Sequence, residues 1–252
     1  MISLTIEGAL AIATLCRPPV NAINEEWITR LDEVLDQVER APAVSVLWIR
    51  SAERVFCAGA DLALMRTRFG TGQGRQQMVD MTRRLQVAYA RLERLGQVSI
   101  AEIGGAAMGG GFELALACDL RVVSDAAKVG LPEARLGLLP GAGGTQRLTR
   151  LCGDAMARRL ILGAELAIGA EAVALGIAHW MAPAAELQSF TRAVAERIGA
   201  LPPHALAACK RCIDSALDAG KNGYEVELAE TGLLLASQAT QQRVQAFLEK
   251  QK

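Results

Sequence analysis

The chain has 252 residues, of which 51% are hydrophobic and only 4% aromatic, and its 27 basic and 27 acidic residues cancel in charge. A chain of this length can bury a full core, built here mainly from Ala, Leu, Val and Ile. Zero net charge argues against a nucleic-acid or membrane-surface protein held by bulk charge, although it allows a local basic cluster for phosphate. We see no targeting peptide and no apolar run of spanning length, and we therefore expect a cytoplasmic protein.

Predicted strands and helices alternate over roughly the first 150 residues. Short apolar runs predict strands at residues 4–6, 10–15, 44–49, 98–103, 120–124 and 128–130. Apolar residues at steps of three and four predict a helix capped by Asn24 and a long helix from Met78 to Leu95. From about residue 151 onward we expect helix almost throughout. This order predicts an α/β architecture with parallel strands and a helical C-terminal region.

Two glutamates lie in turns where a strand is expected to meet a helix. Glu113 follows three consecutive glycines, and Glu133 follows a proline. Both lie in otherwise apolar sequence, and two carboxylates in an apolar site can perform acid–base chemistry on one water molecule. The two histidines, His179 and His204, are not near these turns. We therefore expect carboxylates to carry out any proton transfer.

The glycines at residues 109–111 leave the backbone open to a ligand. A ligand atom can reach the main-chain N–H groups there, and the helix expected to follow adds the positive end of its dipole. Glu113 lies about one helical turn after Gly110 and can share its face. Alternatively, the glycines form only a tight turn and the carboxylate complements the dipole. The dinucleotide-binding pattern G-x-G-x-x-G fails because Leu114 occupies its third glycine position.

Cys209 and Cys212 form a lone C-x-x-C pair among six scattered cysteines. No second pair and no histidine at ligand spacing accompany them. We interpret them as two cysteines one turn apart on a helix, against the alternative of a zinc or redox site, and we expect no metal.

Several segments together resemble the crotonase superfamily, also called the enoyl-CoA hydratase/isomerase superfamily, over nearly the whole chain. These segments are residues 17–22, 56–62, 109–119, 130–133, 138–148, 170–176 and 246–250. Their joint order and spacing carry the resemblance. It implies a crotonase-like spiral of ββα units over residues 1–200 and a C-terminal helical region over 201–252 involved in trimerisation. It also implies a homo-oligomer, a trimer or hexamer, and apolar stripes in the helical tail point the same way.

The resemblance implies an acyl-CoA thioester as substrate and no cofactor beyond the coenzyme A that the substrate carries. It assigns the oxyanion hole to the N–H groups of Ala60 and Gly110, where fixed donors oppose charge on the thioester oxygen. Further substrate contacts are implied for Arg17, Arg54, Ala58, Asp61, Leu62, Gly109, Pro132 and Gly141. No Walker-type loop is present, so scattered bases, namely Arg17, Arg54 and Lys250, are expected to bind the phosphates.

Members of the superfamily that hydrate 2-enoyl thioesters carry glutamate at two positions, which Glu113 and Glu133 match. The resemblance therefore implies an enoyl-CoA hydratase in which Glu113 activates the water and Glu133 delivers a proton to the α-carbon. One alternative is another activity of the superfamily, either 3,2-enoyl-CoA isomerisation or hydration of a branched substrate such as methylglutaconyl-CoA. A second is a non-catalytic binding or RNA-associated protein of this fold. The intact glutamate pair and the zero net charge weigh against that second alternative.

The end of the chain departs from the superfamily pattern. Residues 240–247 are shorter than the usual run and lack its acidic residues. Because that region usually closes the acyl pocket or touches a neighbouring subunit, the sequence leaves the acyl chain length open.

Overall fold

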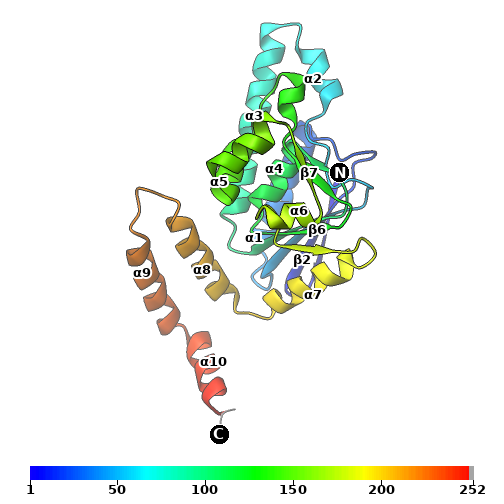
Figure 1. The fold of residues 1–252 in the computed structure, drawn as a ribbon. Helices are drawn as coiled ribbons and strands as arrows, with labels where there is room; N and C mark the ends of the chain where they lie inside the picture. Colours follow the sequence, from blue (N-terminus) through cyan, green and yellow to red (C-terminus); the bar gives the residue numbers. More distant parts are fainter. Residues whose placement is uncertain (250–252) are drawn as a thin grey trace.

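The computed structural model describes residues 1–249 (Figure 1). Its strands are β1 (Ile2–Glu7), β2 (Leu10–Leu15), β3 (Val46–Ser51), β4 (Val98–Ile103), β5 (Ala107–Met108), β6 (Leu120–Ser124), β7 (Lys128–Gly130), β8 (Leu166–Ile168) and β9 (Trp180–Ala182). Its helices are α1 (Glu25–Glu39), α2 (Leu62–Arg68), α3 (Gly72–Glu93), α4 (Gly110–Ala117), the 3₁₀ turn η1 (Glu133–Leu136), α5 (Gly144–Leu162), α6 (Ala170–Ala174), α7 (Leu187–Gly199), α8 (Pro203–Ser215), α9 (Gly223–Ala236) and α10 (Gln238–Glu249).

A six-stranded sheet of order β1-β2-β3-β4-β6-β9 forms the centre of the molecule. β1 and β2 pair as an antiparallel hairpin, and the later strands of this sheet pair in parallel. One face packs on α7, and the other packs on α1, α3 and α4. β4 is buried along its whole length, as expected for a parallel strand covered on both faces. The predicted α/β architecture with parallel strands is confirmed.

Local sequence explains where the two long helices begin. The Asn24 side chain accepts a hydrogen bond from the Trp27 N–H at 2.9 Å, which confirms the predicted cap of α1. The Thr71 side chain likewise accepts one from Gly74, so α3 begins before the apolar stripe that predicted it. Both helices bury that stripe against the sheet.

A second, three-stranded sheet of order β5-β7-β8 brings the glutamate turns together. β5 runs parallel to β7, with Met108 opposite Gly130, and the Gly109 N–H donates to the Gly130 carbonyl at 3.0 Å. A parallel bridge joins Cys57 to Ala107 on the other side of β5. Three turns that are far apart in sequence therefore begin side by side at the end of this small sheet.

The expectation of helix almost throughout after residue 151 is wrong at two places. β8 pairs with β7, and β9 pairs with β6, in a stretch that otherwise forms helices. Each strand has only three residues, too few to show an alternation of period two. Pairing with strands formed earlier in the chain stabilises them, and local sequence does not report that pairing.

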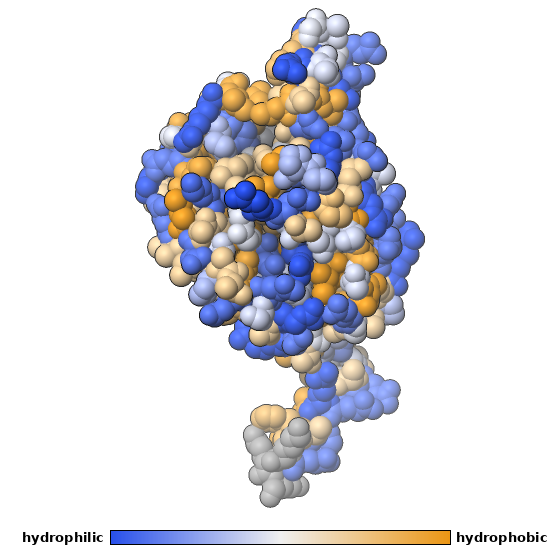
Figure 2. All heavy atoms as spheres, turned by 90° about the vertical axis from the view of Figure 1, so that its right-hand side faces the viewer, coloured by the Kyte–Doolittle hydropathy of each residue, from blue (hydrophilic) through white to orange (hydrophobic). Residues whose placement is uncertain are grey.

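Helices α8 to α10 form an arm beside the body of the molecule (Figure 1), and the lower end of this arm projects below the body in Figure 2. Lys210 of α8 ties its base to the core by donating to Asp119 at 2.6 Å and to the Gln97 carbonyl at 3.0 Å. α9 and α10 nevertheless leave large apolar side chains more than half exposed: Tyr224, Leu228, Leu233, Leu235, Val244, Phe247 and Leu248. Within residues 1–249, no helix has the length and apolarity needed to cross a membrane.

We predict that other copies of the chain cover this arm in a trimer or hexamer, because an apolar surface of this extent is unfavourable in water. Sedimentation velocity at micromolar concentration should give an oligomeric mass for the parent chain. The double variant Leu228→Glu with Phe247→Glu should dissociate. Glu225→Gln, at an exposed residue of α9, is the control and should keep the parent mass. A monomeric parent would contradict this prediction.

Candidate active site

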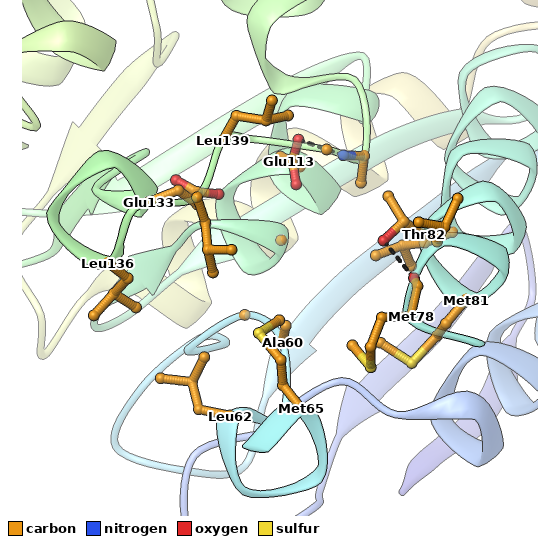
Figure 3. Close-up of a pocket in the computed structure, with 18 of the residues that line it drawn as sticks. Ala60, Leu62, Met65, Met78, Met81, Thr82, Glu113, Glu133, Leu136 and Leu139 are labelled. Carbon is orange, nitrogen blue, oxygen red and sulfur yellow. Dashed lines mark hydrogen bonds between the residues drawn. The ribbon is translucent and has the colours of Figure 1, made fainter. Parts of the chain in front are cut away.

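A cavity of about 790 Å³ lies between the glutamate turns and helices α2 and α3. Figure 3 shows Glu113 and Glu133 on one side of it, with Leu62 and Met65 of α2 and methionines of α3 across from them. Its lining is mainly apolar, so a charged group placed inside loses much of its hydration.

Two backbone N–H groups reach this cavity without a protein partner. Ile23 exchanges hydrogen bonds with Gly59 and Asp61, as one residue does in a parallel bridge, so the intervening Ala60 directs its own N–H away from Ile23. Gly110 is the first residue of α4, where an N–H has no intrahelical acceptor. Within residues 1–249 neither N–H donates to another group. A methyl group on Gly110 would lie 3.8 Å from the Ala60 nitrogen, so the two donors are neighbours.

Glu113 is buried in the first turn of α4, with 2% of its surface exposed. Its Oε1 accepts hydrogen bonds from the N–H groups of Ala142 at 2.8 Å and Gly144 at 2.7 Å. Burial raises the pKa of Glu113 to about 7, and the charge of Glu133 adds to that rise, whereas the two amides oppose it. A side chain on residue 144 would lie 2.8 Å from this oxygen, so only glycine fits there.

Glu133 opens the 3₁₀ turn η1 directly after Pro132. Its Oε2 is buried and has no hydrogen-bond partner in the described part of the chain. Burial raises the pKa of this carboxyl as well. A Cβ on Gly109, whose φ is +51°, would lie 2.9 Å from Glu133 Oε1. Glycine at 109 thus permits both the backbone conformation and the close approach of the carboxyl.

The cavity brings together nine of the site residues expected from sequence: Ala58, Ala60, Leu62, Gly109, Gly110, Glu113, Pro132, Glu133 and Gly141. Arg17, Arg54 and Asp61 do not line it. Arg17 donates to Asp61 at 3.0 Å and to the Ala22 carbonyl at 2.6 Å, and Asp61 caps α2, so this ion pair braces the segment beside Ala60.

Arg54, the other cation expected near phosphate, is exposed on the surface. Lys250, the third, lies outside the described residues. Neither His179 nor His204 lines the cavity. His179 accepts from the Arg121 N–H at 3.1 Å, and burial lowers its pKa to about 4.

Sequence reasoning missed several residues of the site. Gly59, at φ +91°, lets the chain pass the Met108 carbonyl, which would lie 2.8 Å from any Cβ there. The Tyr89 hydroxyl donates to the Gly110 carbonyl at 2.7 Å and anchors the start of α4. Gly59 stands within a turn that the sequence did single out, whereas a tyrosine within an amphipathic helix carries no such signal.

Among the described residues, no group of three or more His, Cys, Asp or Glu side chains could hold a metal ion. Cys209 and Cys212 are free thiols on α8, as expected for a helix pair.

Comparison with known proteins identifies the family. A family model described as enoyl-CoA hydratase/isomerase matches residues 5–252. The chain belongs to the enoyl-CoA hydratase/isomerase family. The predicted superfamily membership is therefore confirmed.

Members of this family are similar to the chain over nearly its whole length. The "Short-chain-enoyl-CoA hydratase" of Clostridium acetobutylicum is 32% identical, covering 98% of this chain and 94% of that protein. The "Crotonyl-CoA hydratase" of Syntrophomonas wolfei is 33% identical, covering 100% and 96%. The crystal structure of an enoyl-CoA hydratase from Bacillus anthracis superposes with a TM-score of 0.91 at 30% identity, covering 99% and 96%. The predicted crotonase-like fold is confirmed by this superposition.

The raised pKa of Glu113 makes stability depend on pH. The folded chain keeps a proton on Glu113 up to a pH of about 7, whereas the unfolded chain releases it near ~4.3. The free energy of unfolding therefore falls as pH rises through this window. Glu113→Gln abolishes the ionisation, and its stability relative to the parent should increase by up to about 3 kcal/mol between about pH 4 and about pH 8.

Denaturant unfolding at the two pH values and one fixed protein concentration measures this change. Glu186→Gln, at an exposed glutamate outside the cavity, is the matched control and should show little pH-dependent gain. An equal effect of Glu113→Gln at both pH values would show that Glu113 ionises normally in the folded chain.

Proposed function

We propose that this chain is an enoyl-CoA hydratase, which adds water across the double bond of a 2-enoyl-CoA thioester to give a 3-hydroxyacyl-CoA. The observation that carries the proposal is the pair of glutamates in an apolar cavity, Glu113 buried and Glu133 half-buried. The same cavity receives the N–H groups of Ala60 and Gly110, which have no acceptor within residues 1–249. Membership of the enoyl-CoA hydratase/isomerase family and the names of the two relatives support it.

The two amides act on the thioester oxygen. As the water oxygen bonds to the β-carbon, the electron pair of the carbon–carbon double bond moves toward the carbonyl and charge gathers on its oxygen as an enolate. The N–H groups of Ala60 and Gly110 donate to that oxygen. One donor of this kind is typically worth ~3–4 kcal/mol in the transition state, because it is already oriented when the charge develops.

The two carboxyl groups divide the proton transfer. The amides of Ala142 and Gly144 favour the ionised form of Glu113 and occupy one oxygen, which leaves the other free to orient the water and accept its proton. Within residues 1–249 no group donates to the buried Oε2 of Glu133, so we assign Glu133 the role of the acid that supplies the proton to the α-carbon. The charge of Glu133 raises the pKa of Glu113, so the pair favours sharing one proton. The form with that proton on Glu133 is the reactive one, and return of the proton from Glu113 to Glu133 restores it after each turnover.

The remaining features of the substrate follow from the walls of the cavity. Methionines and leucines surround the space beyond the carboxyls, which suits an apolar acyl chain. We assign the CoA phosphates to exposed bases such as Arg54, with Arg17 acting mainly through its ion pair with Asp61. No cofactor is required beyond the coenzyme A of the substrate, because acid, base and oxyanion donors all come from the chain.

We predict that Glu113→Gln and Glu133→Gln each reduce hydration of crotonyl-CoA by ~10²–10⁴-fold, since each removes one half of the proton transfer. The loss of enoyl absorbance measures the rate, and binding of coenzyme A checks that the site remains folded. Glu186→Gln serves as the control and should keep the parent rate. Near-normal turnover in either active-site variant would refute the two-carboxyl mechanism.

Gly110→Val tests the oxyanion donor. The first carbon of the new side chain would lie 3.2 Å from Ile23 Cδ1 and beside the Ala60 nitrogen. We predict a loss of turnover of at least ~10²-fold, because the side chain blocks the approach of the thioester oxygen. Gly70→Val is the control, since a Cβ at residue 70 meets no atom within 4 Å. Unchanged kinetics in Gly110→Val would remove Gly110 from the oxyanion hole.

A further inference from the structure

Three successive carbonyls in the loop at residues 141–143 are each held by a fixed donor. The Gly141 carbonyl accepts from Gln86 Nε2 of α3 at 2.6 Å. The Ala142 carbonyl accepts from Arg147 Nη1 at 3.0 Å, and the Gly143 carbonyl accepts from the Arg147 backbone N–H at 3.0 Å. The carbonyl oxygen of each of these three peptide units is therefore hydrogen-bonded.

The N–H groups on the other side of two of these peptide units donate to Glu113. In a trans peptide unit, the C=O of one residue and the N–H of the next point in opposite directions. Fixing the Gly141 carbonyl on Gln86 therefore turns the Ala142 N–H toward Glu113, to which it donates at 2.8 Å. The Arg147 backbone N–H fixes the Gly143 carbonyl, and this turns the Gly144 N–H toward the same oxygen of Glu113, to which it donates at 2.7 Å.

Arg147 is itself firmly held. Its guanidinium donates to Glu93 from Nε at 3.2 Å and from Nη2 at 2.8 Å, and the residue is only 8% exposed. Gly143 has φ +101°, and a side chain there would come within 2.3 Å of Arg147 Nη1. A charge-assisted, two-point contact of this kind fixes a guanidinium better than a single bond.

We propose that Gln86 and Arg147 are positioning residues of this loop. Gln86 orients the Ala142 amide through the Gly141 carbonyl, and the Arg147 side chain fixes the peptide unit of residues 142 and 143, which lies between the two amides that donate to Glu113. Neither side chain is hydrogen-bonded to Glu113 within residues 1–249. The effect of both on the reaction rests on the proposed hydratase function, but the orientation of the loop does not.

Without the Gln86 donor, the Ala142 amide can rotate away from Glu113. Without the Arg147 side chain, the peptide unit between the two donating amides is released, and in both cases the Glu113 carboxylate loses stabilisation. Its pKa should then rise, and the acidic limb of the kcat profile should move to higher pH. The Arg147 cation also lowers the pKa of Glu113 through space, so its removal acts in the same direction. Because the loop acts on the reacting carboxyl, kcat should fall more than KM rises.

The test compares Gln86→Met and Arg147→Met, which keep much of the side-chain bulk but lose the donors, with the parent enzyme on crotonyl-CoA. We expect kcat to fall about tenfold and the acidic limb to rise by about half to one pH unit. Arg147→Lys keeps a cation and a donor, so its kcat and its acidic limb should both lie between those of Arg147→Met and those of the parent. Arg150→Met is the control, because Arg150 reaches Glu93 at 3.8 Å and makes no contact with the loop carbonyls.

A second measurement is independent of activity. In protein labelled with carbon-13 at glutamate carboxyls, the Glu113 signal is the one lost in Glu113→Gln, and its titration should shift upward in both Met variants. Unshifted titration in a folded Gln86→Met, an exposed site that should tolerate the change, overturns the proposal even if Arg147→Met fails to fold. If the parent hydrates no enoyl-CoA, the proposed function fails, and this titration still decides the role of the loop.

Discussion

The parallel pairing of β5 with β7 is the contact on which the site depends. It is only two residues long, yet it places the turn that leads to Glu113 beside the turn that leads to Glu133. The bridge from Cys57 to Ala107 adds the turn that ends at Ala60. Backbone hydrogen bonds set these positions, so the two carboxyls and the N–H groups of Ala60 and Gly110 keep a common geometry.

Burial raises the pKa values of both glutamates, and it also reduces the stability of the folded chain. A carboxyl in an apolar cavity loses hydration, which raises the pKa of Glu113 toward neutrality, where acid–base catalysis is most effective. The chain offsets part of this cost locally, since two loop amides donate to one oxygen of Glu113. Within residues 1–249, Glu133 receives no such donor on its buried oxygen. In the mechanism that we propose, this asymmetry lets Glu113 act as base and Glu133 as acid.

The sequence predicted the elements better than their pairing. Strong apolar patterns located α1, α3 and β4, and the glycine-rich turns led to nine of the residues that line the cavity. β8 and β9 were not predicted, because a strand of three residues shows no periodicity and these two are stabilised by pairing with strands distant in sequence. The roles of Gln86 and Arg147 were not predicted for a related reason. Their contacts with residues 141 and 142 depend on how α3 and α5 pack, which no local sequence pattern indicates. The ion pair of Arg17 with Asp61 was not predicted either, because these two residues are neighbours only in the folded chain.

We assign to this cavity the addition of one water molecule to a conjugated thioester. Incubating crotonyl-CoA with the chain in oxygen-18 water, followed by mass spectrometry of the product, tests this assignment, and a parallel reaction in deuterium oxide follows the proton. We expect 3-hydroxybutyryl-CoA carrying the heavy oxygen on the β-carbon, and deuterium on the α-carbon in the parallel reaction. Unchanged substrate, or a product whose double bond has moved without gaining the heavy oxygen, would contradict it.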